Sequence, residues 1–182
     1  MTMNEGYIAL LRAVNVAGHQ MVAMADLRDM LAALGYTDVK SLLQSGNLVF
    51  RGKPQESEKV EHLLQKSAAE RLDLQTEFFV RTAAEWKAIV AANPFPAEAK
   101  KDPGHLVVMA LKRAPERARF AELQQSIAGR EVVRGHGREA YITYPDGQGR
   151  SRLTNALIEK KLGTRGTARN WNTVMKLLAA CG

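Results

Sequence analysis

The same order of apolar patterns occurs twice along the chain, and this repetition constrains the fold more than any other feature. In each half a strand-like pattern is followed by a helical pattern, two short strand-like patterns, a second helical pattern and a further strand. Strands and helices that alternate in this order pack as a sheet covered by helices. We therefore predict an α+β fold with two ferredoxin-like subdomains in tandem, each a split βαβ unit of βαββαβ order, and a C-terminal helix.

The elements of the first half follow from short apolar runs and from apolar residues at helical spacing. They are strands over 7–11, 39–43, 48–50 and 76–81, and helices over 24–34 and 60–72. The turn residues at 44–47 favour a hairpin or one long bulged strand. On the second helix, we predict that Glu58, Glu61 and Glu70 lie on the solvated face.

A helix and a proline-rich segment separate the two halves. Thr82 and Glu85 have the spacing of a capping box, which predicts a connecting helix with Trp86 on its buried face. Pro94 to Gly104 contains three prolines and predicts a linker. The predicted domains are 1–93, which includes the connecting helix, the linker 94–104, and 105–182, which includes a basic terminal helix.

The second half repeats the pattern of the first. Its predicted elements are a strand over 105–111, a helix that Pro115 opens and Gly129 closes, hairpin strands over 131–134 and 140–144, a helix that begins at Ser151, and a short strand before the last helix.

Composition favours a globular protein in a reducing compartment. Hydrophobic residues make up 46% of the 182 residues and charged residues 25%. No apolar run approaches the roughly 20 residues that cross a bilayer, so we expect a cytoplasmic protein without a membrane partner. The single cysteine, Cys181, cannot form an internal disulfide.

Nearly all of the net charge of +7 lies in the last 33 residues. This segment, Arg150 to Gly182, holds seven of the 26 Lys and Arg residues but one acid, Glu159. Such an excess is compatible with nucleic acid, an anionic membrane or a phosphorylated ligand. The segment is therefore the first candidate for a site that binds anions.

Three polar segments interrupt the apolar patterns, and the first, Arg12 to Gln20, leaves the first strand. Side chains alternate along a strand, so Arg12 and Asn15 can face one site only if the strand ends near Arg12. An arginine directly after apolar strand residues is a partly buried charge that needs a partner. The alternative is a solvated loop with a surface arginine.

The second polar segment is Gln44 to Asn47. Ser, Gly and Asn are common in turns for conformational reasons, which is the structural alternative for Asn47. Gln44 is different because a turn has no special need for glutamine, and its amide can both donate to a ligand and accept from it.

The third polar segment, Thr167 to Leu177, lies in the basic part of the chain. Trp171 belongs to an apolar helical face and is predicted in the core. Asn170 or Asn172 can cap this helix, whose N-terminus favours anions. Arg169 offers a fork for carboxylate or phosphate, and Lys176 shares a helix face with Asn172. The alternative is an asparagine cap with two surface cations.

Other chemistries are weakened by residue counts and spacing. The four histidines, His19, His62, His105 and His136, are separated from one another and from the cysteine, so we expect no metal site. Residues 135–140 match a dinucleotide-binding pattern, but they join two predicted strands instead of a strand and a helix. We expect no cofactor.

The polar segments together resemble the domain-of-unknown-function family 1697. The resemblance rests on residues 10–18, 43–50 and 168–174, and also on 24–35 and 153–163, so it spans essentially the whole chain. It implies a small bacterial-type cytosolic protein of two α+β subdomains, and no activity. Ala13 and Ala17 stand where the family more usually has glycine.

These observations lead to three functional hypotheses. The first is a protein that binds a phosphate-bearing small molecule or nucleotide in a cleft between the two subdomains, through Arg12, Asn15, Gln44, Asn47, Arg169, Asn172 and Lys176. The second is binding of RNA or single-stranded DNA, against which the aromatic content of 6% argues because bases need stacking partners. The third is an enzyme on an anionic substrate, which would need a carboxylate or His19 as a base.

Overall fold

The computed structural model describes residues 3–15 and 20–182. The chain forms two compact units, Met1–Ala88 with Leu177–Gly182, and Ile89–Lys176. Each unit contains a four-stranded antiparallel sheet of ferredoxin-like βαββαβ order, which confirms the predicted fold class. The predicted domain boundaries around 94–104 stay a prediction, and the two units are described separately below.

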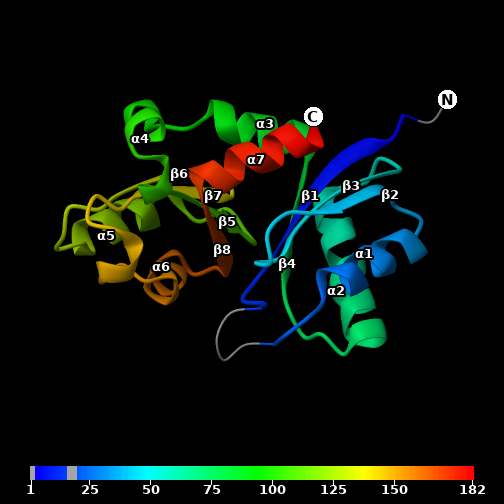
Figure 1. The fold of residues 1–182 in the computed structure, drawn as a ribbon. Helices are drawn as coiled ribbons and strands as arrows, with labels where there is room; N and C mark the ends of the chain where they lie inside the picture. Colours follow the sequence, from blue (N-terminus) through cyan, green and yellow to red (C-terminus); the bar gives the residue numbers. More distant parts are fainter. Residues whose placement is uncertain (1–2, 16–19) are drawn as a thin grey trace. The chain divides into compact units, whose positions relative to one another are not determined.

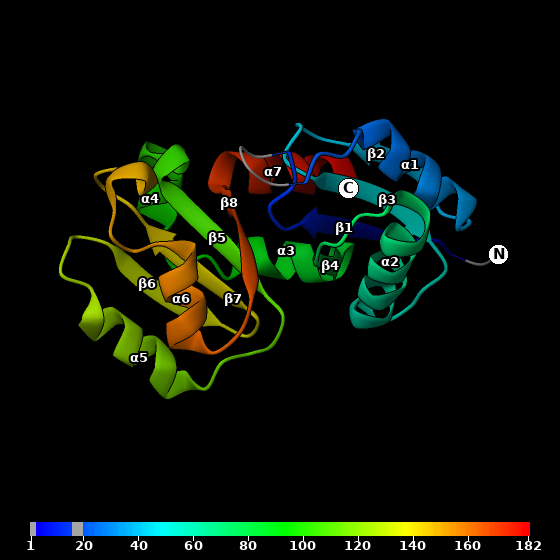
Figure 2. The same ribbon diagram turned by 90° about the horizontal axis from the view of Figure 1, so that it is seen from below.

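The first unit contains a sheet of strand order β2-β3-β1-β4 with two helices on one face (Figures 1 and 2). Its elements are β1 (Glu5–Leu11), α1 (Met24–Ala33), β2 (Thr37–Ser41), β3 (Asn47–Gly52), α2 (Ser57–Leu72) and β4 (Phe78–Thr82). Strands β2 and β3 pair antiparallel as a hairpin, which decides against one long bulged strand, and β2 has a register shift between Thr37 and Lys40.

The central strand β1 is buried on both faces. Alternate residues Tyr7, Ala9 and Leu11 pack in the core formed with α1 and α2. On the other face, a Cβ at Gly6 would lie 3.1 Å from Cys181 Sγ and 3.3 Å from the Cβ of Ala83. The first unit thus covers its second face near Gly6 with the end of α7 (Trp171–Cys181) and the start of α3 (Ala83–Ala91).

Side chains of α2 accept hydrogen bonds from the outer edge of β4. The backbone N–H of Phe78 donates to Gln65 Oε1 at 3.1 Å, and that of Val80 donates to Glu61 Oε2 at 2.9 Å. Four helical residues rise about 6 Å and two strand residues about 6.6 Å, so acceptors four apart on the helix match alternate N–H groups of the strand. The arrangement closes an edge that could otherwise pair with another chain.

The prediction for Glu61 was wrong, whereas Glu58 and Glu70 are exposed as expected. Glu61 is 6% exposed because its carboxylate accepts from the Val80 N–H and lies 4.0 Å from the buried guanidinium of Arg81. The predicted capping box is confirmed, since Thr82 Oγ1 accepts from the Glu85 N–H and Glu85 Oε2 accepts from the Thr82 N–H.

The second unit repeats this plan with the strand order β6-β7-β5-β8 and with α5 and α6 on one face of the sheet (Figures 1 and 2). After α4 (Pro96–Lys101) and the 3-10 helix η1 (Pro103–His105), its elements are β5 (Leu106–Leu111), α5 (Arg117–Ser126), β6 (Val132–His136), β7 (Glu139–Thr143), a 3-10 helix η2 (Gln148–Arg150), α6 (Asn155–Leu162) and β8 (Gly166–Asn170). The short strand predicted before the last helix is β8.

Helix side chains again accept from edge strands in this unit. The N–H of Gly166 in β8 donates to Glu159 Oε1 at 3.0 Å, and that of Val133 in β6 donates to Gln124 Oε1 at 2.7 Å. On the face of the sheet away from α5 and α6, the Tyr141 hydroxyl donates to the carbonyl of Ile89 in α3 at 2.6 Å.

Two helices of the second unit begin later than predicted. Helix α6 begins at Asn155, where Thr154 Oγ1 caps the Leu157 N–H, and not at Ser151. Ser151 instead uses its hydroxyl outside a helix, as donor to Glu131 and as acceptor from Leu153. Helix α5 covers Arg117–Ser126 and so excludes both of the residues predicted to bound it.

No helix in the described ranges 3–15 and 20–182 is both long enough and apolar enough to cross a membrane.

Replacement of Glu61 by alanine is expected to lower the free energy of unfolding by about 3 kcal/mol, because it leaves the Val80 N–H without its acceptor and removes a carboxylate near buried Arg81. Chemical denaturation measures the change. The control Glu70→Ala removes the same charge from the exposed side of α2 and should change stability by less than about 0.5 kcal/mol. Similar losses in both variants would contradict the edge-closing role.

All four tyrosines have a raised pKa, with burial as the largest cause; the pKa of Tyr144 reaches about 12. The unfolded chain should therefore release phenolic protons first, from about pH 10. Stability is then full below pH 10 and falls as pH rises towards 12. Absorbance at the phenolate band should rise at higher pH in the folded protein than in denaturant. Coincident titration curves would show that the rings are accessible.

Candidate functional site

The structure brings the first two polar segments together in the first unit. Strand β1 ends at Leu11. The alternation of side chains along a strand therefore does not force Arg12 and Asn15 onto opposite faces, which is the condition for both to face one site. The Leu11 N–H donates to the Gly46 carbonyl at 2.9 Å, and Asn15 Nδ2 donates to the Gln44 carbonyl at 3.0 Å. We call residues 12–15 and 44–47 the loop pair.

Asn15 organises the loop pair through its side-chain amide. Its Oδ1 accepts from the Val22 N–H at 2.8 Å, and its Nδ2 donates to the carbonyls of Val22 and Gln44. Its φ is 53°, and that of Ala13 is 51°, in the left-handed region that glycine adopts most easily. This conformation gives a physical reason why glycine suits position 13.

Asn47 and Gly46 fix the turn. Asn47 is fully buried, and its Nδ2 donates to the Leu42 carbonyl at 2.9 Å and to Ser45 Oγ at 3.1 Å. Gly46 has a φ of 80°, and a Cβ there would lie 2.7 Å from a methyl group of Val14. Gln44 is exposed, and its side chain forms no hydrogen bond within the described residues.

Arg12 has the partner that its position in the sequence demands. Its guanidinium lies 3.8 Å from Glu77 Oε2, and each of the two side chains is 31% exposed. Its backbone is fixed on both sides, since the N–H donates to the Glu77 carbonyl and the carbonyl accepts from Thr76 Oγ1. The ion pair keeps contact with water, so it holds Arg12 in place without enclosing it.

The third polar segment lies at the junction of β8 and α7 in the second unit. Of the two possible caps, Asn170 is the one used: its Oδ1 accepts from the Thr173 N–H at 3.0 Å. Trp171 is buried, as predicted. Asn172 and Lys176 are exposed and four residues apart, and their side chains form no hydrogen bond or ion pair in the described parts of the chain.

Arg169 is held on its own strand. Its NH1 donates to Thr167 Oγ1 at 2.9 Å and to the Ala168 carbonyl at 2.8 Å. The side chain is only partly exposed, and the loss of hydration lowers its pKa to about 10. The guanidinium is therefore still charged at neutral pH, but at a cost that a nearby anion would reduce.

The structure thus groups Arg12, Asn15, Gln44 and Asn47 in the first unit, and Arg169, Asn172 and Lys176 in the second. Ala17 and His19, the possible base, lie outside the described residues. Within the described residues no group of three or more His, Cys, Asp or Glu side chains could hold a metal ion.

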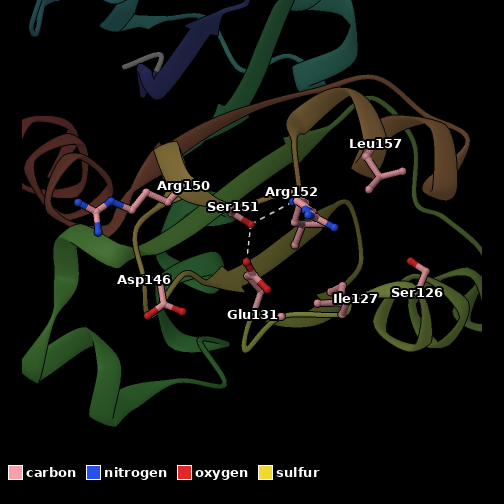
Figure 3. Close-up of a pocket in the computed structure, with 11 residues that line it drawn as sticks. Ser126, Ile127, Glu131, Asp146, Arg150, Ser151, Arg152 and Leu157 are labelled. Atoms are coloured by element: carbon pink, nitrogen blue, oxygen red, sulfur yellow. Dashed lines mark hydrogen bonds between the residues drawn. The ribbon is translucent and has the colours of Figure 1, made fainter.

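A pocket that the sequence did not indicate opens in the second unit (Figure 3). Its cavity volume is about 530 Å³, within the range of small-molecule sites. The lining residues come from the end of α5 and the loop that follows it, from the segment between β7 and α6, and from α6 itself: Ser126, Ile127, Ala128, Gly129, Glu131, Asp146, Arg150, Ser151, Arg152, Leu153 and Leu157. None of the seven predicted site residues lines it; the only signal in the sequence was the basic charge at Arg150 and Arg152.

Hydrogen bonds fix the polar centre of this pocket. Ser151 Oγ donates to Glu131 Oε1 at 2.5 Å and accepts from the Leu153 N–H at 3.0 Å (Figure 3). The Glu131 carboxylate lies so close to Gly129 that a Cβ there would be 2.2 Å from Oε2. Asp146 pairs with Arg130, whose hydrogen bond lowers the pKa of the carboxyl.

Two four-stranded antiparallel sheets with helices packed on them define an α+β protein of tandem ferredoxin-like units. The chain belongs to the family described as "Protein of unknown function (DUF1697)", which matches residues 3–141. Its structure is similar to that of the conserved bacterial protein SP0830 from Streptococcus pneumoniae, with a TM-score of 0.76 and 21% identity over 99% of this chain and 100% of that one. That identity supports a shared fold only. No curated protein matches the sequence significantly.

Asn47→Ala should lower the free energy of unfolding by roughly 1–3 kcal/mol, because it removes a buried amide that donates to the Leu42 carbonyl and opens a cavity. The matched variant Gln44→Ala removes an amide from the exposed part of the same turn and should leave stability within about 0.5 kcal/mol. Thermal and urea unfolding measure both. Equal effects would mean that the two amides have the same role.

Proposed function

We propose that the protein binds an anionic small molecule that carries phosphate, such as a nucleotide, at the junction of β8 and α7. The supporting observation is Arg169, a partly buried guanidinium that keeps its charge at neutral pH and is oriented by Thr167 and Ala168. A guanidinium has five N–H donors in a fixed fork that matches phosphate and carboxylate, and the two hydrogen bonds to β8 set its direction.

The start of α7 adds to the attraction for an anion. The first backbone N–H groups of a helix carry partial positive charge, and Asn170 caps only one of them through its side chain. Asn172 and Lys176 stand one turn apart on the exposed side of α7 and would contribute an amide and an ammonium group. The proposed ligand contacts are thus Arg169, Asn172 and Lys176.

The loop pair of the first unit is a separate candidate for contact with an anion, through Arg12 and Gln44, and we assign Asn15 and Asn47 to positioning. The side-chain amides of the two asparagines donate hydrogen bonds to backbone carbonyls in and next to the loop pair. We also infer a cytoplasmic location, because the single cysteine, Cys181, has no second cysteine with which to form an internal disulfide, as suits a reducing compartment.

A small ligand is favoured over nucleic acid by the burial of the sheets. Ferredoxin-like proteins that bind RNA stack bases on exposed aromatic rings of the central strands. Here the central strands β1, β3, β5 and β7 are buried on both faces over almost their whole length. Stacking on these strands is therefore not open to a single-stranded nucleic acid.

The proposal predicts that Arg169→Gln abolishes the rise in melting temperature that ATP or inorganic phosphate gives to the wild-type protein. Without ligand the variant should melt within about 3 °C of wild type, because the loss of a poorly hydrated charge offsets the loss of the hydrogen bonds to β8. Differential scanning fluorimetry measures both values. Lys160→Gln, which removes a charge from exposed α6, is the control and should respond like wild type.

Two results would reject the proposal. If Arg169→Gln without ligand melts far below wild type, Arg169 is a structural residue. If Lys160→Gln loses the response to ligand equally, the response depends on net charge and not on Arg169. Filter binding over a salt series distinguishes nucleic acid, since oligonucleotide affinity without any response to ATP would favour that partner.

A further inference from the structure

The pocket of the second unit (Figure 3) differs from the β8–α7 junction because its walls carry charges of both signs beside an apolar surface. Two acids, Glu131 and Asp146, and two arginines, Arg150 and Arg152, line it. From this arrangement we propose that the pocket binds a zwitterionic amino acid with an apolar side chain, with Glu131 facing the ammonium group and Arg152 the carboxylate.

Glu131 is prepared to receive a cation. The hydroxyl of Ser151 donates to its Oε1, and the bare backbone of Gly129 leaves room for its carboxylate. In Figure 3 the carboxylate points towards Ser151 at the centre of the lining residues. A carboxylate that accepts from one hydroxyl has further acceptor positions for N–H donors.

Asp146, on the other side of the pocket, already has cationic partners. Asp146 accepts from Arg130 Nε at 3.1 Å and makes a shorter ion pair with NH2 of the same guanidinium. Arg150 also acts on Asp146 electrostatically, and in Figure 3 its side chain extends away from Glu131. Glu131 and Arg152 are therefore the charged groups that remain for a ligand.

Arg152 has no side-chain hydrogen bond or ion pair within the described part of the chain, and it is exposed. Its guanidinium can turn towards a carboxylate and bind it through two parallel N–H donors. In this pocket a simple anion meets Glu131 and a simple cation meets Arg152. A molecule with both charges satisfies both groups.

The apolar part of the lining favours an aliphatic side chain. Leu153 is buried, while Ile127 and Leu157 are partly buried and pack against the core of the second unit. These three side chains offer a surface on which a branched aliphatic group loses contact with water. The volume of about 530 Å³ accommodates an amino acid of this size.

Three probes with the same branched carbon chain test the proposal: leucine, 4-methylpentanoate, which lacks the ammonium group, and 3-methylbutylamine, which lacks the carboxylate. Isothermal titration calorimetry on the full chain measures each affinity. Leucine should bind at least about tenfold more tightly than either analogue, since each analogue leaves one charged partner unmatched.

Variants assign the two charges separately. Arg152→Gln should bring leucine to the affinity of 3-methylbutylamine, and Glu131→Gln should bring it to that of 4-methylpentanoate. Glu131→Gln keeps an acceptor for Ser151, and Arg152 is exposed, so both variants should fold; the ligand-free melting temperature checks this. Lys101→Gln on exposed α4 is the control for charge and should bind leucine like wild type.

The proposal is overturned if none of the three probes binds, if all three bind equally, or if either single-charge analogue matches leucine. It also fails if the Arg152 and Glu131 variants fold and bind leucine as wild type does. Because the lining excludes Arg169, Arg169→Gln should leave leucine binding unchanged, which separates this site from the proposed phosphate site.

Discussion

The central strands of both sheets are buried on their two faces, and much of the structure answers this constraint. The two helices of a βαββαβ unit cover one face only, so each unit needs a further segment for the other face. In the first unit Cys181 and Ala83 lie against Gly6, and in the second the Ile89 carbonyl receives the Tyr141 hydroxyl. Helices α3 and α7 are therefore parts of the cores. Continuous apolar strands such as Leu106–Leu111 follow from the same requirement.

The order of elements was predictable because periodicity reports burial directly. Both βαββαβ runs, the capping box at Thr82 and the burial of Trp171 are confirmed. Element ends were less predictable, since local signals compete with tertiary partners: Ser151 resembles a helix start but bonds Glu131. Glu61 shows the same limit more sharply. Helical spacing predicted that Glu61 is exposed to solvent. In the structure its carboxylate is buried because it accepts a hydrogen bond from the edge of β4, which no local sequence pattern reveals.

The site was only partly predictable, and the reason lies in the versatility of amide side chains. Sequence reasoning selected the loops at Arg12 and Gln44 as candidates for one site, and the structure joins these loops through Asn15. It could not tell an amide that holds the backbone, as in Asn47, from one open to a ligand, as in Gln44. Apart from the basic charge at Arg150 and Arg152, the pocket around Glu131 gave no signal, because its lining comes from segments that meet only after the second sheet and its helices are assembled.

The return of Leu177–Gly182 to the first unit has a consequence for biosynthesis. The ribosome makes β1 long before it makes Cys181, so one side of the first sheet stays bare while the second unit can already fold. Closing so long a loop costs chain entropy before any contact with Gly6 compensates for it, which slows this final step. The nascent chain thus keeps the surface around Gly6 without its α7 cover until residues 177–182 have been made.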